Sequence, residues 1–112
     1  MNKEHNTQVE CVNWYRYNFP DGYIFAVPNG QKRTYAQTIY LKAEGMTTGA
    51  PDLVVVLPNG RVCFVEMKTM SGKQSIEQKE LENKLDMIDN KLYWLCRSSD
   101  EFKDVINYLI TL

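Results

Sequence analysis

Two β-prone segments separated by a short turn constrain the fold of this chain more than any other feature. Residues 52–57 and 61–68 are rich in valine and other strand-forming residues, and Pro58-Asn59-Gly60 between them is a typical turn sequence. Because both segments are bounded by turn residues and have the length of strands, they predict a β-hairpin.

The register of this hairpin decides whether its charged residues meet. A three-residue loop over 58–60 places Asp52 directly opposite Glu66. A two-residue Asn59-Gly60 turn would instead pair Asp52 with Met67 and leave the Asp52 carboxylate on the other face of the sheet, unless a bulge restored the register. The sequence leaves both turns open.

Patterns on either side of the hairpin predict an α/β layered domain with a mixed sheet flanked by helices. Helices are expected at about 4–19, 34–44, 75–89 and after 98, and further strands at 23–27 and 92–96. The third helix is expected to carry Leu81, Leu85 and Ile88 on one face, and the last helix to have an apolar face of Phe102, Val105, Ile106 and Leu109. With 112 residues, the chain can bury one modest core, so residues 1–112 are expected to form a single domain.

Composition excludes several classes of protein. A net charge of -1 gives no global attraction to a polyanion, so any contact with nucleic acid must be local. The three cysteines show no CxxC spacing, which argues against a zinc site or a disulfide framework and favours a reducing cytoplasm. No apolar run approaches the roughly 18 residues of a membrane span, so no membrane contact is expected.

Glu66 and Lys68 are two residues apart on a predicted strand and therefore share one face. If Asp52 lies opposite, two carboxylates converge, and such a pair stays ionised most readily around a hard cation such as Mg²⁺ or Mn²⁺. The ion can polarise a phosphate oxygen and activate water, while the lysine stabilises developing charge. The alternative is an ordinary solvated strand face, but Val62 and Phe64 continue the same stripe and favour a buried one.

Three polar residues on the predicted helices are further candidates for this site. Gln78 either completes a capping box with Ser75 or points its amide toward the sheet. In the first helix Glu4 and Gln8 share one face, and Gln8 is the better candidate for a metal ligand. Glu4 is equally well explained as an acidic residue favoured by the helix dipole.

Five short motifs occur in an order that resembles VRR-Nuc domains. They are Val27-Pro28-Asn29-Gly30, Lys42-Ala43-Glu44-Gly45, Gly49-Ala50-Pro51-Asp52, Glu66-Met67-Lys68 and Ser75-Ile76-Glu77-Gln78. The resemblance covers the chain from Glu4 to the last helix and is greatest to the short, stand-alone members common in bacteriophages.

The resemblance implies a PD-(D/E)XK restriction-endonuclease-like fold, Mg²⁺ or Mn²⁺ dependence and hydrolysis of phosphodiester bonds in DNA. It also implies a preference for branched DNA, with homodimers acting on four-way junctions, and no small-molecule cofactor. By position, Asp52, Glu66 and the backbone carbonyl of Met67 correspond to metal ligands, and Lys68 to the catalytic lysine. Gln78 corresponds to the motif glutamine and Gln8 to the polar residue of the first helix, where glutamate is also common.

Basic residues, most of them in loops, are candidates for contacts with DNA phosphates. The candidates are Lys32, Arg33, Lys42 and Lys73, together with the loop residue Asn29. Two other functions remain open: a nuclease with general or single-strand preference, and a catalytically inactive nucleic-acid-binding module on the same fold. If the chain is encoded by a phage, its expected location is the cytoplasm of the bacterial host.

Overall fold

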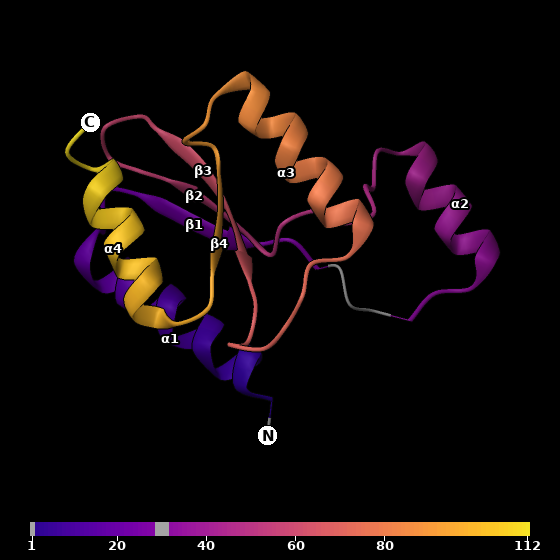
Figure 1. Ribbon diagram of the computed structural model, residues 1–112, viewed down its shortest axis with the longest axis horizontal. Coiled ribbons are helices and arrows are strands. Elements are labelled where there is room, and N and C mark those ends of the chain that lie inside the picture. Colours follow the sequence, from indigo (N-terminus) through magenta and orange to yellow (C-terminus); the bar gives the residue numbers. More distant parts are fainter. Residues whose placement is uncertain (1, 29–31) are drawn as a thin grey trace.

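The computed structural model describes residues 2–28 and 32–112, and in these ranges it contains four helices around one four-stranded sheet (Figure 1). The elements are α1 (Lys3–Asn18), β1 (Tyr23–Ala26), α2 (Tyr35–Ala43), β2 (Leu53–Val56), β3 (Val62–Met67), α3 (Ile76–Ile88), β4 (Tyr93–Cys96) and α4 (Ser99–Leu109). Their order is the one predicted from the sequence, and the predicted boundaries agree to about one residue.

The sheet is mixed, as predicted. Its strands lie in the order β1-β2-β3-β4; β1, β2 and β3 are antiparallel neighbours, and β4 runs parallel to β3. Val56 pairs with Val62 and Leu53 with Val65, and the Leu57 N–H donates to the Arg61 carbonyl at 2.8 Å. The turn is therefore the three-residue loop, and its last residue, Gly60, has a φ of 87° that suits glycine.

One face of the sheet carries the hydrophobic core. Figure 1 shows α1 and α4 together on this side, and they pack on the alternate residues of the strands that point toward them. The buried residues include Cys11, Tyr15, Leu53, Val55, Cys63, Val65, Met67, Cys96, Phe102, Ile106 and Leu109. The prediction for α4 is confirmed, with Val105 partly buried against this cluster.

The other face is covered only by α3, and incompletely. Leu81 and Leu85 are half-buried, but Ile88, which was predicted on the same helix face, is 73% exposed. Among the described helices and strands, α3 has backbone contacts with β4 and reaches β3 through the Gln78–Glu66 hydrogen bond near its start, which leaves its last turn uncovered. Val62 and Phe64 are half-buried rather than fully buried for the same reason.

Helix α2 projects from the body of the molecule (Figure 1). Within the described residues it packs on no other helix or strand, and none of its side chains is buried. Local interactions define it: Thr34 and Gln37 form a complete capping box at its start, and Gly45 follows its end with a φ of 109°.

No helix in the described part of the chain has both the length and the apolar character needed to cross a membrane. Cys11, Cys63 and Cys96 are free and buried, and burial raises the pKa of each thiol to about 12. These thiols therefore act as small apolar core residues.

Candidate active site

The carboxylates of Asp52 and Glu66 meet across the β2–β3 hairpin, as the three-residue turn predicts. Asp52 precedes β2, and the ladder continued by one step from the Leu53–Val65 pair places it opposite Glu66. Its Oδ2 accepts a hydrogen bond from the Met67 N–H at 2.7 Å, which fixes its orientation. The Asp52 and Glu66 carboxyl groups lie within hydrogen-bonding reach of each other.

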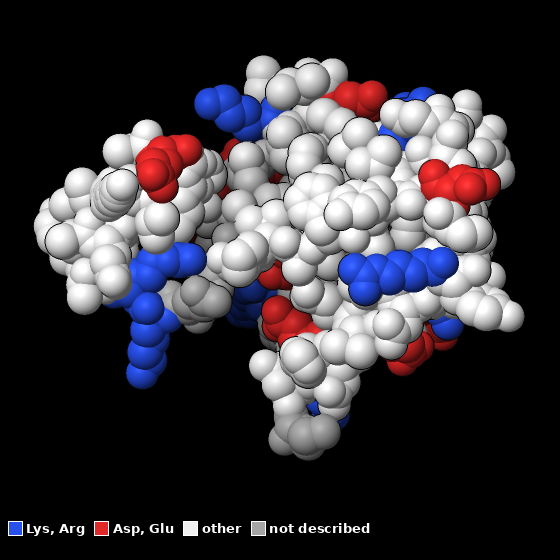
Figure 2. Space-filling view, turned by 180° about the vertical axis from the view of Figure 1, so that it is seen from behind, with Lys and Arg blue, Asp and Glu red and all other residues white. Residues whose placement is uncertain are grey.

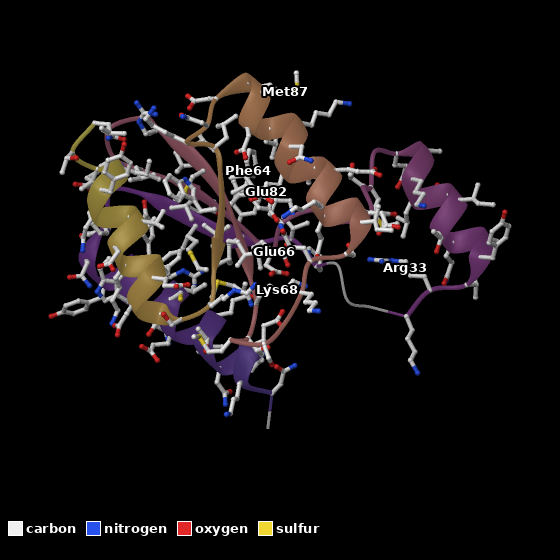
Figure 3. The ribbon with its side chains drawn as sticks, viewed as in Figure 1. Arg33, Phe64, Glu66, Lys68, Glu82 and Met87 are labelled. Atoms are coloured by element: carbon white, nitrogen blue, oxygen red, sulfur yellow. The ribbon has the colours of Figure 1, made fainter. Side chains whose placement is uncertain are left out.

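Glu66 is the one buried charged residue of the described chain, with 1% of its surface exposed. Its Oε2 accepts a hydrogen bond from Gln78 Nε2 at 3.0 Å and lies 3.8 Å from Lys68 Nζ. Its Oε1 is buried without a hydrogen-bond partner. Figure 3 shows Glu66 and Lys68 side by side near the N-terminal end of α3. A buried oxygen without a partner is costly, so this atom marks a place where a ligand belongs.

Burial raises the pKa of Glu66 from 4.5 to about 8, and the negative charge of the neighbouring Asp52 carboxylate adds to this effect. Lys68 acts in the opposite direction, and the negative charge of Glu4 raises the pKa slightly further. Without another cation the site therefore favours the protonated form of Glu66 near neutral pH. A divalent ion would reverse this preference, since metal binding requires the carboxylate form.

Gln78 performs both of the roles that the sequence suggested as alternatives. Its Oε1 accepts a hydrogen bond from the Ser75 N–H at 2.8 Å and completes the capping box, while its Nε2 donates to Glu66. The two ends of one amide thus link the start of α3 to the acidic pair.

The loop that leads to Asp52 is held close to the same helix end. Gly49 has a φ of 82°, and a Cβ at this position would lie 2.7 Å from the Glu77 carbonyl carbon and 2.8 Å from Gln78 N. Only glycine allows this approach. The Gly49-Ala50-Pro51-Asp52 motif therefore brings Asp52 close to α3, the helix whose Gln78 orients Glu66.

Glu4 and Gln8, the two candidates on α1, line different pockets. Glu4 is close enough to act electrostatically on Glu66, and it lines a pocket of about 270 Å³ together with Lys68. Gln8 lies one turn further along the same face and lines a second pocket, which also includes Glu4. Both residues therefore stay candidates for a ligand role.

The donor set at this site fits a hard divalent cation. The described residues contain no group of three or more His, Cys, Asp or Glu side chains placed to hold a metal ion, so the acidic pair would need further oxygen ligands. Asp52, Glu66, the Met67 carbonyl and a more distant Glu4 supply oxygen only, which suits Mg²⁺ or Mn²⁺ rather than Zn²⁺. The unpartnered Glu66 Oε1 is the observation that favours such an ion.

The predicted DNA-contacting residues lie on and around the projecting arm, which we define as residues 32–45. Lys32 and Lys42 are exposed, Arg33 is half-exposed, and Lys73 is exposed in the loop before α3. Figure 2 shows basic side chains on this arm beside a hollow that separates it from the body, with acidic atoms visible in the hollow. Arg33 is drawn toward the same gap in Figure 3. Asn29 lies outside the described residues.

Arg97 is a residue near the site that the sequence did not identify. The register of β3 and β4 pairs Met67 with Cys96, so Arg97 follows β4 beside Lys68 at the same end of the sheet. The sequence could have indicated Arg97 only through the parallel pairing of β3 with β4. This pairing places Arg97 next to Lys68 once the strand register is known.

A mixed sheet with a hairpin Asp, a strand Glu-x-Lys and helices on both faces is the arrangement of the PD-(D/E)XK fold class. No protein-family model matches the chain, and no curated protein matches it. A solved structure described as a VRR_NUC domain superposes with a TM-score of 0.67 at 23% sequence identity, over 96% of this chain and 98% of that one. The chain therefore has the fold of a VRR_NUC domain, as the motif order implied.

Proposed function

We propose that the chain is a divalent-metal-dependent nuclease that hydrolyses phosphodiester bonds in DNA. The observation that carries the proposal is the buried, unpartnered Oε1 of Glu66, which lies in a carboxylate pair beside Lys68. An inactive binding module would gain nothing from keeping two carboxylates together under burial, because that arrangement destabilises the fold.

The residues of the site have separate roles in this proposal. Asp52, Glu66 and the Met67 carbonyl hold the ion, and Gln78 orients Glu66 through the Nε2–Oε2 hydrogen bond. Mg²⁺ or Mn²⁺, when bound, supplies Lewis acidity toward a phosphate oxygen and toward water. Lys68, with a side chain only 16% exposed, carries positive charge to the reacting phosphate.

The projecting arm supplies a surface for the DNA backbone. Lys32, Arg33 and Lys42 extend from a segment that stands beside the acidic site without packing on the body. Local positive charge of this kind compensates for a chain whose net charge is -1, since phosphate contacts depend on where the charge lies.

The preferred substrate in this proposal is branched DNA, cleaved by a homodimer. One chain carries one acidic pair, and paired cuts across a four-way junction require two such sites related by a two-fold axis. The exposed apolar residues of α2 support a dimer: Tyr35 is 83% exposed, and Ile39 and Tyr40 are also exposed. Interfaces are enriched in tyrosine, whereas the two tryptophans, Trp14 and Trp94, are already half-buried in the monomer.

The test is cleavage of labelled four-way junction, flap, duplex and single-stranded DNA with Mg²⁺, Mn²⁺ or EDTA. Wild type is compared with Lys68→Ala and with Arg61→Ala, a control at the opposite end of β3 beside the hairpin turn. We expect metal-dependent cleavage that falls about 100–1,000-fold in Lys68→Ala and is unchanged in the control.

The pattern across the panel decides between the open alternatives. Paired cuts in the junction support the junction-selective enzyme, and equal cutting of all substrates leaves a general nuclease. DNA binding without any cutting would instead establish the inactive binding module. Light scattering is the companion measurement, since a monomer at working concentration contradicts paired cleavage.

A further inference from the structure

Arg97 ties down the loop that follows Lys68. Its Nη1 donates to the Thr69 carbonyl at 2.7 Å and to the Gly72 carbonyl at 2.6 Å, with a longer contact of 3.4 Å to the Met70 carbonyl. Hydrogen bonds from a charged guanidinium are stronger than those between neutral groups. The segment from Thr69 to Gly72 is thus fixed at both ends by one side chain.

Arg97 is itself anchored to the start of α4. Its backbone N–H donates to Glu101 Oε1 at 2.6 Å. Ser98 still accepts the Glu101 N–H through its hydroxyl. The Glu101 carboxylate thus accepts from the N–H of Arg97, one residue before the N-cap Ser98. This hydrogen bond connects the loop, through Arg97, to α4, which packs in the core.

The tethered loop forms one wall around the Lys68 side chain. A Cβ placed on Gly72 would lie 3.6 Å from Lys68 Cδ, so the backbone of the loop is adjacent to the lysine stem. At its far end, the Lys68 ammonium lies 3.8 Å from Glu66 Oε2. A lysine stem is flexible, and confinement by the loop reduces the number of positions that the ammonium can occupy.

We propose that Arg97 is a positioning residue that acts through the loop from Thr69 to Gly72 to hold the Lys68 ammonium at the acidic pair. This inference rests on the proposed nuclease function. Arginine suits the role because Nη1 carries two N–H donors held in the plane of the guanidinium, one for each of the carbonyls of Thr69 and Gly72, whereas a lysine ammonium rotates freely on a flexible stem.

Contact with DNA is the competing role for Arg97, and the kinetics separate the two. Arg97 lines the pocket of about 270 Å³ with Lys68 and Thr69, so its guanidinium is accessible from that side. A phosphate contact acts on affinity and on the salt dependence of binding. A positioning role acts on the chemical step, because a small misplacement of a catalytic group lowers kcat.

The experiment is a double-mutant cycle in single-turnover cleavage with Arg97→Ala, Lys68→Ala and the double variant, with Arg61→Ala as the control. We expect Arg97→Ala to lower the cleavage rate about 10–100-fold with little change in DNA affinity. The double variant should be no slower than Lys68→Ala alone, since the effect of Arg97 passes through Lys68. Added guanidinium ion should partly restore Arg97→Ala, and Arg97→Lys should fall between Arg97→Ala and wild type.

Two results of the cycle would overturn the inference while leaving the nuclease proposal intact. One is an unchanged cleavage rate in Arg97→Ala, with or without a loss of DNA affinity. The other is an additive effect in the double variant. A readout without catalysis is the ¹⁵N relaxation of the amides from Thr69 to Gly72, which should show increased motion in Arg97→Ala but not in Arg61→Ala. Rigid amides in the Arg97 variant refute the tether, whereas an inactive wild type refutes the proposed function instead.

Discussion

The end of β3 and the projecting arm are built in opposite ways. Glu66 stands on a strand with neighbours on both sides and Lys68 follows the end of that strand, and the Glu66 carboxyl group is buried between the sheet, the Asp52 loop and the start of α3. In contrast, α2 has only nine residues, packs on no other element in the described ranges, and is defined by its own caps.

This difference indicates a division of work between the two regions. Groups that act on a reacting atom must be held within a fraction of an ångström, which a packed strand provides. Groups that contact a phosphate backbone need charge and reach, and a projecting helix supplies both. Because an isolated helix of this length is marginal in water, the arm is expected to be stabilised by binding to DNA or to a second copy.

The largest expected effect comes from Asp52→Asn in the rigid region. Loss of one carboxylate removes several kcal/mol of metal-dependent stabilisation, so cleavage should fall by at least about 1,000-fold. Above pH 8, where Glu66 is ionised, the free energy of unfolding without metal should rise, because the Asp52 charge that opposes this ionisation is gone. Single-turnover cleavage and thermal melting in EDTA measure both effects, and a variant that melts lower than wild type in EDTA above pH 8 would contradict the proposed repulsion.

The pH dependence of stability tests the same region without catalysis. The pKa of Glu66 is raised in the folded state, so the stabilisation from its protonated form is complete below pH 4.5 and is lost as the pH rises toward about 8. In EDTA the free energy of unfolding should therefore decrease by a few kcal/mol over this pH window, and the melting temperature should decrease with it.

Glu66→Gln is the matched control for this measurement, because it has no proton to lose and should show a flatter profile. Mg²⁺ should raise the melting temperature of wild type more at pH 8 than at pH 5. Parallel pH profiles for the two proteins would refute the raised pKa.

The two capping boxes offer a matched pair across the two regions. Gln78→Ala and Gln37→Ala remove the same local interaction, from α3 and α2 respectively, but only Gln78 also donates to Glu66. Gln78→Ala should weaken Mn²⁺ binding about 10–100-fold, while Gln37→Ala should leave it unchanged. Calorimetric titration gives both affinities, and equal values for the two variants would confine Gln78 to its capping role.

The smallest expected effect lies in the arm. Lys32→Ala with Arg33→Ala should lower DNA affinity on the order of 10-fold and reduce the salt slope of binding by about 1–2, at an unchanged cleavage rate for bound DNA. Lys103→Ala in α4, which pairs with Glu10 at 3.8 Å, is the control for general loss of charge. Fluorescence anisotropy over a salt series measures the slope, and identical slopes for both variants would remove the arm from the DNA interface.

The sequence predicted the positions of the candidate site residues unequally well. Asp52, Glu66 and Lys68 come together as the three-residue turn predicts. Gln78 could be assigned to a cap or to the site but not to both, because the sequence does not give the direction of each end of an amide. Glu4 and Gln8 both stay candidates, since the sequence does not give how far α1 extends past the sheet.

The sequence by itself determined the order of the elements and their boundaries, and it narrowed the register of the hairpin to two turns between which the structure decided. These properties depend on residues close together in the chain: alternation along a strand, capping residues at helix ends, and the turn at 58–60. Only the tertiary structure decided that Glu66 Oε1 lacks a partner, that Arg97 holds the loop beside Lys68, and that α2 and Ile88 are uncovered. Each of these depends on contacts between segments far apart in the chain, which packing sets and local pattern does not encode.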